Sequence, residues 1–111
     1  IDSMEHWRIV QRGHAGANLV PVIVANRVGK EQIEDSSITF YGSSFIADEH
    51  GQLVASADRT SETILVHTFD LDAIRRTRSA WGIFRDRRPD VYTALATYDG
   101  KHIHIGSKGK N

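Results

Sequence analysis

The sequence contains no cysteine and only 2 proline residues among 111. Without cysteine, the chain has no disulfide, no thiolate ligand for zinc and no thiol nucleophile. It also lacks an apolar run near the roughly 18 residues that span a bilayer, and no charged leader followed by a hydrophobic stretch opens it. These absences exclude disulfide-rich scaffolds and favour a cytoplasmic protein without membrane attachment.

The chain also lacks an excess of charge of either sign, since 14 Lys and Arg balance 14 Asp and Glu. A neutral chain has no overall attraction to nucleic acid or to anionic membranes, although a local patch stays open. Its 40% hydrophobic and 25% charged residues are typical of a globular protein. At this length we expect one domain at most.

The first third of the chain predicts a helix followed by a strand. Residues 3–17 place apolar and small side chains at three- and four-residue steps, which is the pattern of a helix that packs on a sheet. Asp2 and Glu5 have the spacing of a capping box, and Asn18 suits the end of the helix. The run LVPVIVANRV over residues 19–28 predicts a strand that is buried on both faces.

The middle of the chain predicts further strands. Residues 29–37 are polar and predict a loop. Residues 38–47 predict a strand that is interrupted at residues 42–44, where a glycine favours a bulge or a close backbone approach. Residues 52–57 predict a strand that pairs back after a turn, and TILVHTF over residues 63–69 predicts another short strand.

The last third predicts one more helix and then irregular structure. Asp70 or Asp72 is expected to cap the helix LDAIRRTRSAW, which ends near Gly82. Residues 83–90 contain Pro89 and predict an irregular segment. Residues 91–98 fit either helix or strand, and residues 99–111 predict a flexible tail.

Histidine and serine residues raise two catalytic hypotheses that the sequence does not support. His102 and His104 would share one strand face, but no third ligand lies beside them, so we predict no metal site. A hydrolytic triad on Ser43 or Ser44 lacks the glycine-serine-glycine elbow. We expect these serines to satisfy backbone groups beside the strand interruption.

Arginine is concentrated near the C-terminal end, between residues 75 and 90. Six arginines lie in this segment: Arg75, Arg76, Arg78, Arg85, Arg87 and Arg88. They could contact a phosphate or RNA, but the segment lacks interleaved aromatic residues. Arginine forks commonly bind nearby carboxylates, so structural or interface pairing with neighbouring aspartates is the favoured interpretation.

Asn26 and Arg27 directly follow the apolar run. Polar residues at the exit of an otherwise apolar strand lie at the rim of a layered α/β sheet, where ligand sites gather. A structural asparagine that holds neighbouring backbone explains Asn26 equally well. Both interpretations stay open at this point.

Three long strings then resemble a known family. DSMEHWRIVQRGHAGANLVPVIVANRVGKE, ITFYGSSFIA and FDLDAIRRTRSAWGIFRDRRPDVY are similar to the C-terminal part of the carbon-nitrogen hydrolase (nitrilase) superfamily. The resemblance implies an α/β fold, the C-terminal portion of a four-layer αββα sandwich. It assigns residues 1–98 to the C-terminal part of that domain.

The resemblance implies an activity for a longer protein rather than for this chain. Family members use a Cys nucleophile, a Glu general base and a Lys that stabilises the oxyanion. None of the three can be placed here, so no catalytic residue is expected in this chain. The implied reaction hydrolyses a carbamoyl amide, with N-carbamoylputrescine as substrate and putrescine, ammonia and carbon dioxide as products. Another ureido acid or an aliphatic amide is the alternative substrate.

Some residues can be carried over from the family pattern. Asn26, Arg27, Tyr41 and Ser43 match positions at the rim of the active-site pocket, and Asn18 matches a structural asparagine. The loop acids Glu31, Glu34 and Asp35 could hold an amine-bearing substrate. The resemblance implies a small-molecule amide substrate, a homo-oligomer, no cofactor and no metal. A non-catalytic module that contacts an anionic partner through residues 75–88 remains the second hypothesis.

Overall fold

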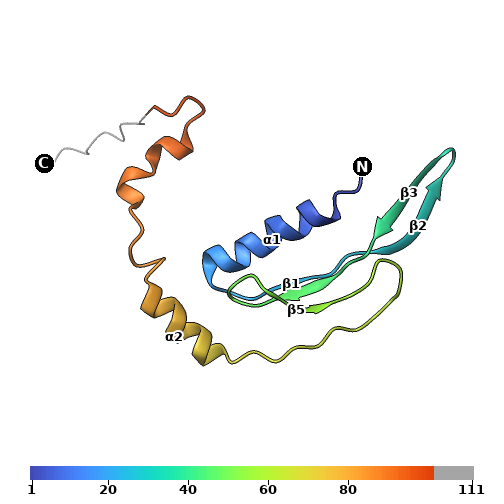
Figure 1. The fold of residues 1–111 in the computed structure, drawn as a ribbon. Helices are drawn as coiled ribbons and strands as arrows, with labels where there is room; N and C mark the ends of the chain where they lie inside the picture. Colours follow the sequence, from blue (N-terminus) through green and yellow to red (C-terminus); the bar gives the residue numbers. More distant parts are fainter. Residues whose placement is uncertain (102–111) are drawn as a thin grey trace, which may run out of the picture. The chain divides into compact units, whose positions relative to one another are not determined.

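The computed structural model describes residues 1–101 (Figure 1). The chain divides into two compact units, Ile1–Trp81 and Gly82–Asn111. Within the described residues, neither α-helix combines the length and the apolar character needed to cross a membrane.

The first unit begins with helix α1 (Met4–Asn18), as the sequence predicted. The Asp2 carboxylate accepts the Met4 amide at 3.1 Å, while Ser3 occupies the N-cap position without a side-chain cap bond. The C-cap was predicted at Asn18, but Leu19 is the residue that takes the left-handed conformation, with φ of 48°. Leu19 is 1% exposed, so its burial in the core accompanies the turn that ends the helix.

Helix α1 covers one face of a three-stranded antiparallel sheet. The strands β1 (Val22–Val24), β4 (Phe45–Ala47) and β5 (Leu53–Ser56) lie in the order β1-β4-β5. Trp7 packs edge-on against the fully buried Phe45, with ring centroids 5.6 Å apart. Ala15 on the helix and Ala47 on β4 complete the centre of this small core.

The prediction of a strand buried on both faces was wrong. Strand β1 has three residues, and only Val22 and Val24 pack toward the core. Ile23 points the other way and is 73% exposed. Alternate side chains of a strand face opposite sides, and the described residues place a helix over one side only.

The polar segment that predicted a loop is instead a hairpin. Strands β2 (Val28–Ile33) and β3 (Ser36–Tyr41) pair in register around a tight turn at Glu34, which has φ of 50°. Most hairpin residues are exposed on both faces, so the sequence shows no apolar alternation that would reveal strands.

The predicted interruption of the next strand is confirmed. Strand β3 ends at Tyr41 and β4 starts at Phe45, with Gly42 at φ of 53° and Ser43 at φ of 62° between them. A Cβ at Gly42 would lie 2.7 Å from the Val28 side chain and 3.0 Å from two backbone oxygens. Glycine is therefore required both by conformation and by space.

The strand predicted over residues 63–69 is absent from the structure, where this segment has no regular secondary structure and pairs with no described strand. Helix α2 (Leu71–Trp81) follows as predicted. The Asp70 carboxylate accepts the Ala73 amide at 2.9 Å and so caps its first turn. Ile74 is its one buried residue.

The second unit holds two short 3₁₀ helices, η1 (Pro89–Val91) and η2 (Thr93–Ala96). The irregular segment predicted before them is confirmed, and the undecided stretch after it is helical in part. The Tyr92 hydroxyl accepts the Arg88 amide at 2.9 Å. Beyond Lys101 the predicted flexible tail, including His102 and His104, lies outside the described residues.

Gly42→Ala tests the tight passage between β3 and β4. An alanine there must adopt positive φ and meet backbone oxygens, so we expect a loss of about 2 kcal/mol of stability. Gly13→Ala is the matched control, because Gly13 is helical with nothing within 4 Å of an added Cβ. It should raise stability by about 0.5–1 kcal/mol. Denaturation midpoints measure both, and a similar effect of the two variants would contradict this account of Gly42.

Candidate functional site

Two segments of the first unit leave the three-stranded sheet for the hairpin at the same place, which we call the junction (residues 25–27 and 42–44). The Gly42 amide donates to the Arg27 carbonyl at 2.9 Å. The Asn26 amide donates to Ser44 Oγ at 2.8 Å, and Asn26 Nδ2 donates to the Gly42 carbonyl at 2.8 Å. Asn26 Oδ1 also accepts the Arg27 amide at 2.9 Å. Asn26 therefore holds the backbone of both segments.

Ser43 is the one buried polar side chain of the junction, at 2% exposure. Its hydroxyl donates to the Tyr41 carbonyl at 2.8 Å, and its amide donates to the Asp58 carbonyl at 2.9 Å. Arg8 of helix α1 reaches the Ser43 carbonyl with Nε at 3.3 Å and Nη2 at 3.0 Å. The left-handed backbone of Ser43 is thus fixed from three directions.

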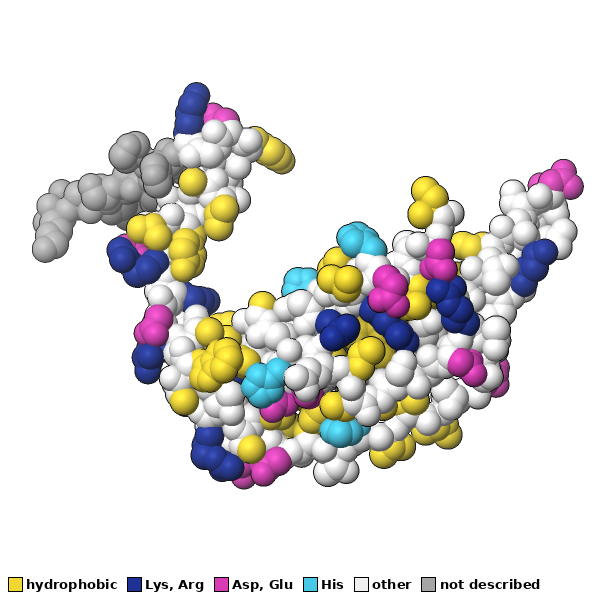
Figure 2. Space-filling view, viewed as in Figure 1, with side chains coloured by type: hydrophobic (Ala, Val, Ile, Leu, Met, Phe, Trp, Pro, Cys, Tyr) yellow, Lys and Arg dark blue, Asp and Glu magenta, His cyan; other side chains and the backbone are white. Residues whose placement is uncertain are grey.

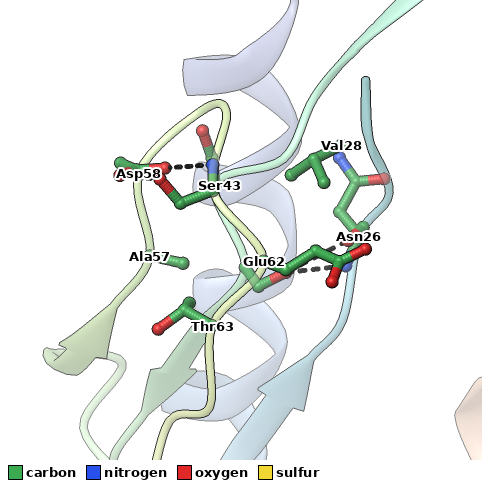
Figure 3. Close-up of a pocket in the computed structure, with 9 residues that line it drawn as sticks. Asn26, Val28, Ser43, Ala57, Asp58, Glu62 and Thr63 are labelled. Atoms are coloured by element: carbon green, nitrogen blue, oxygen red, sulfur yellow. Dashed lines mark hydrogen bonds between the residues drawn. The ribbon is translucent and has the colours of Figure 1, made fainter. Parts of the chain in front are cut away.

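A pocket of about 190 Å³ opens beside the junction. Figure 3 shows Asn26 and Val28 on one side of it, with Ala57, Asp58 and Thr63 on the other. Polar side chains dominate the lining. The complete set is Asn26, Val28, Ser43, Ser44, Ala57, Asp58, Ser61, Glu62 and Thr63.

The two carboxylates of this pocket differ in their state of pairing. Asp58 accepts the Ser61 amide at 2.7 Å, the Thr60 amide at 2.9 Å and the Ser61 hydroxyl at 2.9 Å. These hydrogen bonds from Ser61 and Thr60 lower the pKa of Asp58 below its ordinary value. Glu62 has no hydrogen bond or ion pair with any described residue, so its charge is available to a ligand.

The arrangement suits binding rather than covalent chemistry. The Ser43 hydroxyl donates to the Tyr41 carbonyl. The Ser44 hydroxyl accepts the Asn26 amide and donates to the Asn26 carbonyl. Neither serine has a histidine base among residues 1–101, so the described chain holds no hydrolytic triad on them. The serines satisfy backbone groups, as expected from the sequence.

Of the remaining rim candidates, Arg27 belongs to the junction and Tyr41 directly precedes it, but neither lines this pocket. The Arg27 side chain pairs with Glu31 and stacks over Phe40, with its guanidinium carbon 4.8 Å from the ring centroid. Tyr41 packs edge-on against Trp7 at 5.5 Å between centroids. The structure therefore brings Asn26 and Ser43 together in the pocket and places the other two outside it.

Two of the loop acids lie on the β2–β3 hairpin, and Asn18 lies at the end of helix α1. Glu31 is paired with Arg27 on the hairpin, while Glu34 lies at the hairpin turn. Neither lines the pocket. Asn18 Nδ2 donates to the His14 carbonyl at 2.9 Å within the last turn of α1.

One group of potential metal ligands occurs among the described residues. Oxygen and nitrogen atoms of Asp48, Glu49 and His50 lie within 4.8 Å of one another. Asp48 Oδ1 already accepts the amides of His50 and Gln52, both at 2.9 Å, and so shapes the turn before β5. The group has a structural explanation without an ion.

Several arginines pair with neighbouring residues. Arg75 pairs with Asp72 on α2. In the second unit Arg85 makes a two-pronged contact with Asp86 at 2.8 and 2.9 Å, and Arg88 binds Asp90 in the same way at 2.9 and 2.6 Å. These pairs raise the pKa of Arg85 and Arg88 and lower that of their partners. The pattern favours structural pairing over an anionic ligand.

Comparison with known proteins places these observations in a family. The carbon-nitrogen hydrolase family model matches residues 2–79, which include the junction and the whole pocket. The chain belongs to the carbon-nitrogen hydrolase family. It is 58% identical to an N-carbamoylputrescine amidase of Arabidopsis thaliana, covering 90% of this chain and 35% of that protein. It is 48% identical to a citrullinase of Francisella tularensis, covering 85% of this chain and 33% of that protein.

A solved structure confirms the predicted α/β fold of this carbon-nitrogen hydrolase chain. It is that of a carbon-nitrogen hydrolase from Helicobacter pylori, with a TM-score of 0.75 and 38% identity. The match covers 91% of this chain and 34% of that one. The chain thus spans about a third of the length of the relatives it matches.

Sequence reasoning missed three residues of this carbon-nitrogen hydrolase site. Arg8 reaches the junction from helix α1, and Asp58 and Glu62 line the pocket from a loop outside the quoted family strings. Asp58 carried a usable signal, because an aspartate side chain in a polar loop commonly accepts the backbone amide two residues on, as Asp58 does with Thr60. Arg8 and Glu62 gave none, since charged residues on a helix or in a polar loop are common.

Asn26→Asp tests the amide that holds the junction. The variant keeps an acceptor for Arg27 but loses the donor to Gly42, and its carboxylate faces a carbonyl oxygen. We expect a stability loss of about 1–3 kcal/mol. Asn18→Asp, which also removes an amide donor to a carbonyl but at an exposed helix end, should cost less. Thermal midpoints compare the two, and equal losses would contradict a special role for Asn26.

Asp58→Asn tests the carboxylate turn through its pH dependence. Because folding lowers the pKa of Asp58, its contribution to stability is present above the ordinary aspartate pKa and disappears as pH falls through the lowered value. The variant should therefore melt below the wild type at pH 7, with the gap closing in acid. Melting temperatures between pH 7 and pH 3 measure this, and a gap that is constant across that range would refute it.

Proposed function

We propose that this chain is the C-terminal part of a longer amidohydrolase that cleaves the carbamoyl amide of N-carbamoylputrescine. The reaction consumes water and yields putrescine, ammonia and carbon dioxide. The catalytic Cys, Glu and Lys would come from the rest of that protein, since this chain has no cysteine. The chain alone is then inactive and contributes the pocket rim and scaffold.

The observation that carries this proposal is the high sequence identity between this chain and several proteins that share the name N-carbamoylputrescine amidase. Proteins called N-carbamoylputrescine amidase in Arabidopsis thaliana and Oryza sativa share 58% and 54% of aligned residues with this chain. These matches cover 90% and 91% of it, so the likeness extends over nearly every described element.

The charge of the junction pocket supports the same substrate. N-carbamoylputrescine carries a cationic amine at the end opposite its carbamoyl group. Among the described residues, Glu62 offers an unpaired carboxylate in a pocket otherwise lined by hydroxyls, an amide, the apolar side chains of Val28 and Ala57, and Asp58, which is hydrogen-bonded to its own turn. Opposite charges favour a cationic ligand there, whereas citrulline would also bring a carboxylate toward Glu62.

We assign Asn26, Arg27, Tyr41 and Ser43 to the rim of the substrate site of the longer protein, with Asn18 as a structural residue. Of the four, Asn26 and Ser43 line the junction pocket, whereas Arg27 and Tyr41 lie beside it. Asn26 and Ser43 would shape the wall through their backbone bonds. A role in polyamine biosynthesis, a cytoplasmic location and a homo-oligomeric assembly are part of the same proposal. They rest on the family resemblance.

A second candidate is hydrolysis of a different ureido compound. The 48% identity to a citrullinase, over 85% of this chain, favours it as the main alternative. Both substrates present a terminal carbamoyl group, so they differ mainly at the distal end that the pocket charge would select.

Ammonia release by the longer protein tests the function. We expect turnover of N-carbamoylputrescine with a kcat/KM at least tenfold above that for citrulline, a ratio that one opposed charge pair of about 1.4 kcal/mol would give. The 111-residue chain assayed alone should release no ammonia. Turnover of citrulline without turnover of N-carbamoylputrescine would reject the proposed substrate and favour the alternative.

A further inference from the structure

Arg8 on helix α1 holds two residues that lie far apart in the sequence. Its Nε and Nη2 atoms donate to the Ser43 carbonyl at 3.3 and 3.0 Å, and Nη2 also donates to Ser56 Oγ at 2.8 Å. The guanidinium carbon lies 5.6 Å from the centroid of the buried Phe45 ring. The planar guanidinium carries several donors in a fixed geometry, so one side chain can bind acceptors from two segments at once.

The two acceptors of Arg8 belong to two segments that line the junction pocket. Ser43 lines the pocket itself, while Ser56 ends β5 and directly precedes Ala57, which also lines it. The Ser43 amide already joins the two segments by donating to the Asp58 carbonyl at 2.9 Å. Arg8 adds a further link from behind, where α1 passes behind the pocket in Figure 3.

Arg8 also differs from the arginines that pair with carboxylates. Figure 2 shows basic side chains near acidic ones at the surface, and Arg27 and Arg59 pair in this way with Glu31 and Asp2. Arg8 is half-buried and donates to a carbonyl and a hydroxyl instead. A charged donor makes a stronger hydrogen bond than a neutral one, and partial burial reduces screening by solvent. The side chain is therefore well suited to fix the backbone of the pocket.

We propose that Arg8 is a positioning residue of the substrate site, because it holds Ser43 and Ser56 together and so sets the separation of the two segments that bind the distal end of the substrate. The inference rests on the proposed function, since it takes the junction pocket as the place where that end binds. Ser43 has φ of 62°, a conformation that serine keeps only where its surroundings fix it. The residues that act on the carbamoyl group lie outside this chain, so Arg8 affects substrate binding rather than the bond-breaking step.

Arg8→Gln in the longer protein tests this role through the separate effects on KM and kcat. With the ureido substrate that the wild type cleaves best, we expect KM to rise about tenfold and kcat to stay within about twofold. An unchanged KM, or a fall in kcat alone, would overturn the proposal. If the wild type cleaves citrulline but not N-carbamoylputrescine, the proposed substrate is wrong, whereas the same rise in KM for citrulline still supports the role of Arg8.

Arg12→Gln is the matched control for a general loosening of α1. Arg12 is also half-buried on α1 and donates Nε to the Gly51 carbonyl at 2.7 Å, but Gly51 lies in the turn between β4 and β5, at the end of the sheet away from the junction. Both variants lose an arginine-to-carbonyl bond from one helix, so their melting temperatures should fall by similar amounts. Only Arg8→Gln should raise KM, and an equal rise in Arg12→Gln would reject the assignment.

Arg8→Lys keeps the proposal testable if Arg8→Gln does not fold. Lysine retains the positive charge but not the planar fork that binds Ser43 and Ser56 together, so we expect a rise in KM of about threefold with kcat unchanged. A wild-type KM in Arg8→Lys would count against the proposal, because the charge alone would then suffice.

Discussion

A single amide side chain, that of Asn26, holds the two segments that pass between the sheets of the first unit. Where a strand leaves a sheet, its backbone groups lose their ladder partners, and buried groups without partners are costly. Asn26 donates to the Gly42 carbonyl and accepts the Arg27 amide, while Ser44 receives the Asn26 amide. These bonds replace the ladder and fix the left-handed residues between β3 and β4.

The geometry of the pocket follows from this fastening. Because the hydroxyls of Ser43 and Ser44 donate to backbone carbonyls, they hold the pocket wall in place and do not act as nucleophiles. Asp58 is likewise used by its own turn. Glu62 is left as the charged group with no described partner, which gives the site a selective charge without a nucleophile. A pocket wall without a nucleophile agrees with a chain that spans only about a third of the length of the amidase it resembles.

The arginine-rich segment shows how local pairing changes the meaning of a sequence pattern. As a string, residues 75–90 resemble a binding site for an anion. In the structure, Arg75, Arg85 and Arg88 each bind an aspartate one to three positions away. These exposed pairs contribute little to stability, but they reduce the net charge that a phosphate would meet.

The sequence by itself determined the two α-helices, the break at residues 42–44 and the turn into β5, because each depends on capping, glycine or periodicity within a few residues. The family strings likewise determined the α/β fold. The β2–β3 hairpin escaped prediction because both its faces are exposed. The strand predicted at residues 63–69 does not form in the structure, because no described strand pairs with that segment. Only the tertiary structure decided which polar groups meet at the pocket. Asn26 and Ser44 lie 18 positions apart, and Arg8 and Ser43 lie 35 apart, so their contacts depend on how helix α1 and the strands pack together.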